Sequence, residues 1–81
     1  MKLDYHPRVI QQLADAPIAV RHAFDGKVKF LAKNLRHPSL RAKKYDEMHD
    51  IWQARITRGW RFYFQIHGDT YIIFSIIPHP K

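Results

Sequence analysis

Residues 51–78 constrain the fold more than any other part of this chain. They read IWQARITRGWRFYFQIHGDTYIIFSIIP, three runs of apolar, β-branched and aromatic residues separated by two short polar breaks. Such runs predict strands, and breaks this short join neighbouring strands as antiparallel hairpins. Gly68-Asp69 suits a two-residue type II′ turn, and Thr57-Arg58-Gly59 suits a three-residue loop with its glycine in the left-handed conformation. We therefore expect a three-stranded meander.

Side chains alternate between the two faces of a strand, which sorts the meander into two predicted faces. One face is almost purely apolar and must be covered: Trp52, Ala54, Ile56, Trp60, Phe62, Phe64, Ile66, Ile72, Phe74 and Ile76. The other face carries Gln53, Arg55, Thr57, Arg61, Tyr63, Gln65, Tyr71, Ile73 and Ser75. Because a solvated sheet face usually carries short polar residues, lysine and glutamate, the arginines and tyrosines indicate a binding site.

The first half of the chain predicts a strand followed by two helices. Residues 3–6 suit a short strand, and Pro7 starts a helix that runs to Ala16, since the first helical N–H needs no partner. A second helix follows, with Asp15 as a possible N-cap and Pro17 in its first turn. Its apolar stripe recurs at helical spacing and ends before a proline: Val20, Phe24, Val28, Leu31 and Leu35. Its lysines lie mostly on the solvated side: Lys27, Lys29 and Lys33.

Residues 42–46 suit an edge strand, where lysines block edge-to-edge pairing. The predicted order is β-α-α-β-β-β-β. This is an α+β class, with an N-terminal strand and a helical hairpin packed on one face of an antiparallel β-sheet, in a single domain over residues 1–81.

Charge favours a polyanionic partner. Fourteen Lys and Arg against seven Asp and Glu leave a net charge of +7, which attracts nucleic acid first and an anionic membrane second. The chain has no cysteine, so a disulfide framework and a thiolate metal site are excluded. No apolar run is long enough for a membrane span, and the first residues lack the apolar core of a secretory signal, so we expect a cytoplasmic protein without a membrane partner.

Several kinds of chemistry have no matching motif. The histidines fall at positions 6, 22, 37, 49, 67 and 79, and no two have the spacing of a zinc site, so we expect no metal. No glycine-rich phosphate loop or nucleophile elbow occurs, and we expect no cofactor.

The polar sheet face suits metal-free cleavage of RNA, in which the ribose 2′-hydroxyl attacks the adjacent phosphorus. Arg55 and Arg61 can hold the phosphate, Tyr63 and Tyr71 can stack on bases, and His79 can transfer the proton. The remaining candidate RNA contacts are basic: Arg41, Lys43, Lys44 and Lys81. The simpler alternatives are solvated or ion-paired arginines, a lysine pair that acts only through its charge, and a histidine in a frayed tail.

The stretch HPSLRAKKYDEMHDIWQARITRGWRFYFQIHGDTYII resembles the C-terminal two-thirds of the RelE/ParE superfamily of toxin–antitoxin toxins. A basic stretch at residues 37–44 precedes an aromatic-x-x-Arg strand (Trp52 to Arg55) and an aromatic-Arg-x-x-aromatic strand (Trp60 to Phe64). The turn and the Trp-Arg pair look more like the HigB-like branch than RelE itself, and the resemblance extends over essentially the whole chain.

The resemblance implies a metal-independent toxin that cuts mRNA, often on the ribosome, and that a cognate antitoxin protein silences. By position, Arg61 matches the family's phosphate-binding arginine, His79 the residue after the last strand, and Lys43 and Lys44 the basic pair. Many members continue with an arginine and a near-terminal tyrosine where this sequence has Pro80-Lys81, so either Tyr63 or Tyr71 substitutes or catalysis is weaker.

Members of the ParE branch share the fold, lack the nuclease residues and inhibit DNA gyrase. A gyrase inhibitor is therefore the alternative function, and a decayed toxin that only binds its antitoxin is a third. Fold alone does not separate these functions.

Overall fold

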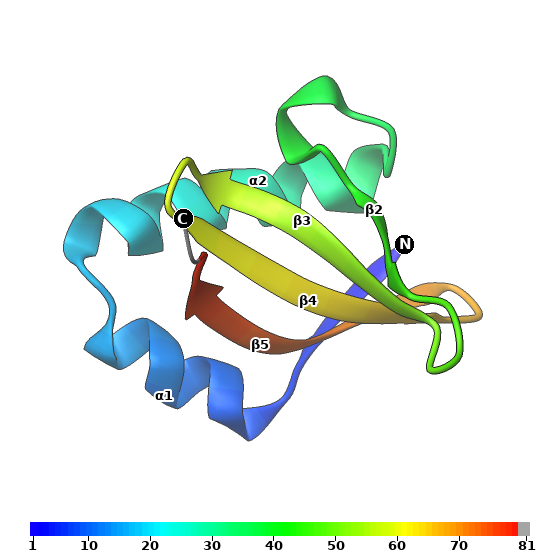
Figure 1. Cartoon of the computed structure of the whole chain (residues 1–81), viewed down its shortest axis with the longest axis horizontal. Coiled ribbons are helices and arrows are strands. Elements are labelled where there is room, and N and C mark those ends of the chain that lie inside the picture. The colour runs from blue at the N-terminus through cyan, green and yellow to red at the C-terminus, as the bar shows by residue number, and fades with distance from the viewer. Residues whose placement is uncertain (80–81) are drawn as a thin grey trace.

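Five strands form one sheet in the order β1-β5-β4-β3-β2 in the computed structural model, which describes residues 1–79 (Figure 1). The strands are β1 (Lys2–Tyr5), β2 (Lys43–Asp46), β3 (Ile51–Thr57), β4 (Trp60–His67) and β5 (Thr70–Pro78). Neighbours are antiparallel except β1 and β5, which run parallel. The meander of residues 51–78 and the order β-α-α-β-β-β-β are confirmed, and β1 completes the sheet beside the last strand.

Two helices lie between β1 and β2: α1 (Pro7–Asp15) and α2 (Ile18–Lys33). The α1 helix packs against β5 and α2 against β3, as Figure 1 shows. Gln12 of α1 accepts a 2.7 Å hydrogen bond from the backbone N–H of Ile76, at a part of β5 that β1 does not reach. The predicted N-cap of α2 was wrong: Asp15 is the last residue of α1, and Pro17 occupies the cap position without a side-chain hydrogen bond.

The core lies between α2 and the sheet face that the sequence identified as apolar. Phe62 and Phe64 are fully buried, and the ring of Phe62 meets Phe24 of α2 edge to face at 5.4 Å. Burial of aromatic side chains of this size contributes strongly to the stability of a fold. The predicted stripe of α2 supplies the opposite wall: Val20, Phe24, Val28 and Leu31.

The predicted faces of β5 were wrong before Ser75. The register shifts between Tyr63 and Phe64, which pair with Ser75 and Ile73, so Phe74 is the extra residue of a bulge. A bulge inserts one residue and reverses the alternation on one side of it. Tyr71 and Ile73 therefore lie in the core, and Tyr71, at 4% exposure, cannot stack on RNA as predicted.

The two predicted turns had different outcomes. Gly68 has a φ of 60°, as a two-residue turn with glycine at its first central position requires. At the other turn Thr57 pairs with Trp60, so only Arg58 and Gly59 form the connection, and Gly59 is not left-handed. Thr57, which the sequence predicts in the loop, is instead paired in the sheet, and the register shifts between Arg55 and Thr57.

Within the described residues, no helix is long and apolar enough to cross a membrane.

Candidate functional site

The sheet face opposite α2 carries a hollow of about 210 Å³ that we call the basic cleft, lined by Arg41, Lys43, Gln53, Arg55, Arg61 and His79. These residues come from the segment before β2, from β2, β3 and β4, and from the residue after β5. Five of the six are candidates from the sequence, and no carboxylate of residues 1–79 lines the hollow. The arrangement therefore gathers guanidinium, ammonium and imidazole groups around one small space.

Arg55 and Arg61 are direct cross-strand partners in β3 and β4. Like charges directly opposite each other destabilise a sheet, so this pair costs stability unless an anion lies between them. Burial lowers the pKa of Arg61, and the charge of Arg55 lowers it further. Two guanidinium forks on one face suit the bidentate recognition of a phosphate.

The Arg61 side chain also binds the turn between β3 and β4. Its Nη1 donates hydrogen bonds to the carbonyl oxygens of Thr57 (2.8 Å), Arg58 (3.2 Å) and Trp60 (3.0 Å). These bonds fix the direction of the guanidinium while Nε and Nη2 make no hydrogen bond within the described residues. Arg61 therefore combines a structural role in the turn with donors that are open to a ligand.

His79 lies in the cleft as the sequence predicted, although Pro78 precedes it. Its backbone N–H donates a 2.7 Å hydrogen bond to the carbonyl oxygen of Gly59, which ties the end of β5 to the turn between β3 and β4. The imidazole consequently stands at the same hollow as Arg55 and Arg61. Its role in proton transfer stays a prediction.

The predicted basic pair is split between the two faces of β2. Lys43 pairs with Gln53 and lines the cleft. Lys44 pairs with Trp52 on the opposite face, with its ammonium 5.1 Å from the ring centroid and ion-paired with Asp50. Because adjacent strand residues point in opposite directions, only one of the two lysines can reach the cleft. The placement of Lys44 beside the site was therefore wrong.

Beside the cleft the same face continues as a more apolar hollow, which we call the aromatic shelf, lined by Arg8, Tyr45, Ile51, Tyr63, Phe74, Ser75 and Ile77. Tyr63 is only 8% exposed, and its hydroxyl accepts a 2.9 Å hydrogen bond from Gln53, so its ring has little free surface for a base. Tyr45 meets Tyr63 edge to face at 5.0 Å and is 61% exposed. The sequence interpretation missed Tyr45, whose place on an edge strand was its only signal. The predicted contact of Lys81 lies outside the described residues.

A third hollow, the lysine pocket, shares residues with the cleft and is lined by Lys27, Pro38, Ser39, Arg41, Arg55, Ile56 and Thr57. Arg41 and Arg55 line both hollows. Arg41 follows the 3-10 helix η1 (Pro38–Leu40) in a left-handed conformation, with φ of 46°, which is uncommon for a residue other than glycine. Lys27 comes from α2, and helical spacing assigned it only to a solvated side, so the sequence interpretation missed it.

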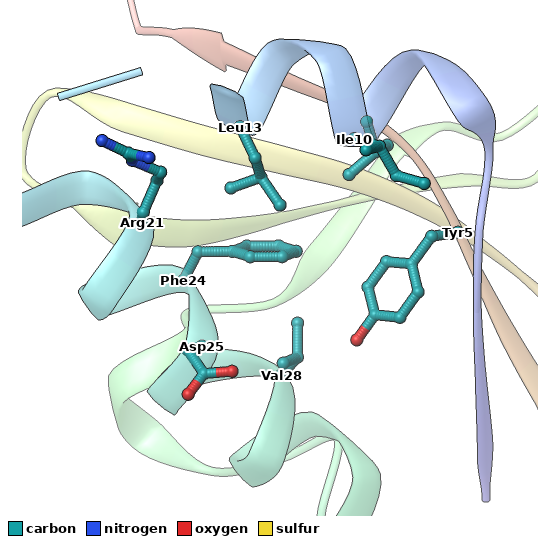
Figure 2. A pocket seen from close by; sticks show the side chains of 8 residues that line it. Tyr5, Ile10, Leu13, Arg21, Phe24, Asp25 and Val28 are labelled. Atoms are coloured by element: carbon teal, nitrogen blue, oxygen red, sulfur yellow. The ribbon is translucent and has the colours of Figure 1, made fainter. Parts of the chain in front are cut away.

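A fourth hollow lies on the helical side of the molecule. Figure 2 shows Ile10 and Leu13 of α1 facing Phe24 and Val28 of α2, with Tyr5 of β1 closing one end. Ile10 is 66% exposed there. Among the described residues, Arg21 and Asp25 are the charged side chains that line this apolar groove.

Among residues 1–79, no three His, Cys, Asp or Glu side chains gather closely enough to hold a metal ion.

The fold defines a class: it is the α+β fold of RelE/ParE toxins, with the same order of strands and helices. A YoeB/ParE toxin from Agrobacterium tumefaciens superposes with a TM-score of 0.79 at 13% identity, over 99% of this chain and 100% of that one. The isolated Escherichia coli RelE toxin gives a TM-score of 0.77 at 18% identity, over 99% of this chain and 85% of that one.

A chain of the intact E. coli RelBE toxin–antitoxin complex gives a TM-score of 0.72 at 14% identity, over 99% of this chain and 96% of that one. No family model matches the sequence, and no curated protein matches it. The likeness at these identities establishes the fold, which confirms the fold that the sequence resemblance implied.

Proposed function

We propose that this protein is the toxin of a type II toxin–antitoxin system and a metal-independent endoribonuclease that cleaves mRNA. The observation that carries the proposal is the cross-strand pair of Arg55 and Arg61 facing a hollow that His79 also lines and that no carboxylate of residues 1–79 lines. A site of this composition favours an anionic ligand on which further negative charge develops and from which a proton is transferred. An RNA phosphodiester with its neighbouring 2′-hydroxyl fits both requirements.

In the proposed reaction the 2′ oxygen attacks phosphorus, and the bond from phosphorus to the 5′ oxygen of the next nucleotide breaks. Arg55 and Arg61 stabilise the charge that grows on the non-bridging oxygens. His79 transfers a proton, either from the 2′-hydroxyl or to the departing 5′ oxygen. The products are a 2′,3′-cyclic phosphate and a 5′-hydroxyl, with no change in oxidation state.

The proposed partners follow from the shared fold. A solved RelBE complex contains a toxin chain of this fold together with its antitoxin, which supports a cognate antitoxin protein as a partner here. Translated mRNA, on the ribosome, is the proposed substrate, as the sequence resemblance implies. Both assignments place the protein's action in the cytoplasm.

One observation favours the alternative function of a ParE-like inhibitor of DNA gyrase. The Nη1 of Arg61 is fully used by three backbone carbonyl oxygens, which gives this arginine a structural role without any RNA. The name of the Agrobacterium toxin, YoeB/ParE, likewise joins two branches of this fold. The alternative predicts growth inhibition without new transcript ends.

The experiment is induction of the protein, mapping of transcript ends, and assay of the purified protein on RNA in EDTA. We expect cleavage in EDTA with cyclic or 3′-phosphate ends, and a rate that changes between about pH 5.5 and 7.5, where imidazole side chains titrate. His79→Gln keeps hydrogen-bonding capacity without proton exchange in that range. It should leave RNA affinity near normal and slow cleavage by about 10²-fold or more.

The matched control is His67→Gln, because His67 is an exposed histidine at the end of β4, outside the lining of the cleft. It should cleave at the wild-type rate. Full-speed cleavage by His79→Gln would remove His79 from the reaction. Cleavage that EDTA abolishes and magnesium restores would overturn the metal-free mechanism, and inhibited gyrase with intact transcripts would favour the alternative.

A further inference from the structure

Among the described residues no carboxylate lines the lysine pocket, and it shares Arg41 and Arg55 with the basic cleft. Lys27 reaches it from α2, and its ammonium donates a 3.0 Å hydrogen bond to the carbonyl oxygen of Ser39 in η1. An ammonium has three N–H donors, so two stay open to the pocket. Among the described residues Lys27 has no ion pair, whereas Lys29, two positions further along α2, pairs with Asp25 at 3.4 Å.

The charge of Lys27 is held at a cost. Burial lowers the pKa of Lys27, and the charges of Arg55 and Arg41 lower it further. Lys27 is half-buried, as are Arg55 and Ser39 beside it. Three cations converge on one pocket, and among residues 1–79 a single backbone carbonyl, that of Ser39, accepts a hydrogen bond from Lys27. An anion would relieve this repulsion and use the open donors.

We propose that the lysine pocket is a second phosphate subsite, in which Lys27 holds the phosphate that neighbours, along the RNA chain, the one held in the basic cleft. The inference rests on the proposed function, which supplies RNA as the ligand. Arg41 and Arg55 line both hollows, so the two phosphates would share the same two arginines. This arrangement fits consecutive phosphates of one strand and positions the scissile one by anchoring its neighbour.

The test uses adenosine 3′,5′-bisphosphate, which carries on one ribose the two phosphates that are neighbours in RNA, and adenosine 3′-monophosphate. Titration calorimetry at low ionic strength gives the ratio of the two affinities. We expect the wild type to prefer the bisphosphate by about tenfold or more, the effect of one added charge-assisted contact. Lys27→Met and Lys27→Gln should remove most of that preference.

The two variants separate charge from structure. Lys27→Gln keeps a donor for the Ser39 carbonyl oxygen and loses only the charge, so it serves if Lys27→Met does not fold. Lys29→Met removes the same charge from the same helix at an exposed, ion-paired position, and it should keep the wild-type ratio. Urea unfolding of each variant reports its stability.

A wild-type ratio in Lys27→Gln would overturn the subsite and leave Lys27 as a tie between α2 and η1. The same ratio loss in Lys29→Met would also overturn it, since the preference would then follow net charge. The binding assay needs no cleavage: a protein that cleaves no RNA but shows the Lys27-dependent preference retains the subsite while the nuclease proposal fails. A protein that cleaves RNA with no such preference retains the nuclease and loses the subsite.

Discussion

Charged side chains at the two ends of β3 are arranged in opposite ways. At the β2–β3 turn each basic side chain lies beside a carboxylate: Lys44 pairs with Asp50, and the His49 ring lies 2.8 Å from Asp46. At the β3–β4 end, Arg55 faces Arg61 across the sheet, and no carboxylate among residues 1–79 forms an ion pair with either. The same strand thus neutralises its charges at one end and accumulates them at the other.

The difference shows where the surplus of positive charge is directed. Seven acidic residues cannot pair with fourteen basic residues, so some cations must be unpaired. Unpaired cations scattered over the exposed surface would not indicate a binding site. Concentrating them opposite each other on adjacent strands destabilises the sheet locally. A protein that breaks a local rule of stability at one place usually does so at its functional site.

The largest expected effect is on cleavage by Arg61→Ala. Losing one preorganised electrostatic contact to the transition state should slow cleavage by about 10²–10³-fold. Arg61→Lys should recover only part of the rate, because an ammonium cannot grip two oxygens. Rates are measured on one RNA substrate at fixed salt.

The structure adds a stability measurement to this test. The turn carbonyls lose their Nη1 donor in Arg61→Ala, so we expect unfolding free energy to fall by about 1 kcal/mol. A folded Arg61→Ala protein that cleaves at the wild-type rate would show that this arginine serves only the turn.

The next effect sets the two ends of β3 directly against each other. Arg55→Gln removes a like-charge pair and should raise the free energy of unfolding by roughly 0.2–1 kcal/mol at low salt. Lys44→Gln removes the same charge from the paired end and should lower stability. Both changes should shrink near 1 M salt, where the screening length is about 3 Å. Urea unfolding at two salt concentrations measures both, and equal signs would break the contrast.

A smaller effect separates the adjacent lysines of β2. Lys43→Ala should flatten the dependence of log affinity for single-stranded RNA on log salt by about 0.7, the change for one lost phosphate contact. Lys44→Ala should leave that slope unchanged, because Lys44 lies on the opposite face with Asp50. A slope change of equal size for both lysines would mean that overall charge, and not the cleft, binds the RNA.

The smallest effect is a pH dependence at the paired end. Hydrogen bonds from the ring of His49 and then from its backbone N–H lower the pKa of Asp46. The folded pKa lies below the unfolded one, so the contribution is fully present above about pH 4 and is lost as the pH falls through the folded value. Asp46→Asn should therefore be slightly less stable than wild type at pH 6, with a difference that shrinks toward pH 2 in thermal unfolding.

The sequence was sufficient for the fold because hydrophobic runs and turn residues specify element order. It failed where one residue changes the register. Strict alternation predicts Tyr71 on the same sheet face as Arg61, whereas the extra residue Phe74 places it in the core. No residue type marks a bulge of this kind. The wrong face for Tyr71 therefore follows from applying the two-residue period of a regular strand to a strand that contains a bulge.

The candidate site was partly predictable for a similar reason. Arg55 and Arg61 lie on regular parts of β3 and β4, so their shared face follows from alternation. Lys27 could not be found that way, because helical spacing tells only which side of α2 faces the core. Lys27 became a candidate because it lines one pocket together with residues of η1 and of β3. That arrangement is tertiary, and no local sequence pattern encodes it.

The parallel pairing of β1 with β5 bears on the order in which the candidate site forms during synthesis. Lys2 pairs with Thr70 and Tyr5 with Ile73, so β1 can take its place in the sheet only after β5 has been made. Contacts this distant in sequence close slowly, and domains emerge N-terminal end first. His79 reaches the turn between β3 and β4 only after β5 is in place. The basic cleft is therefore incomplete until β5 has been synthesised and has paired with β4.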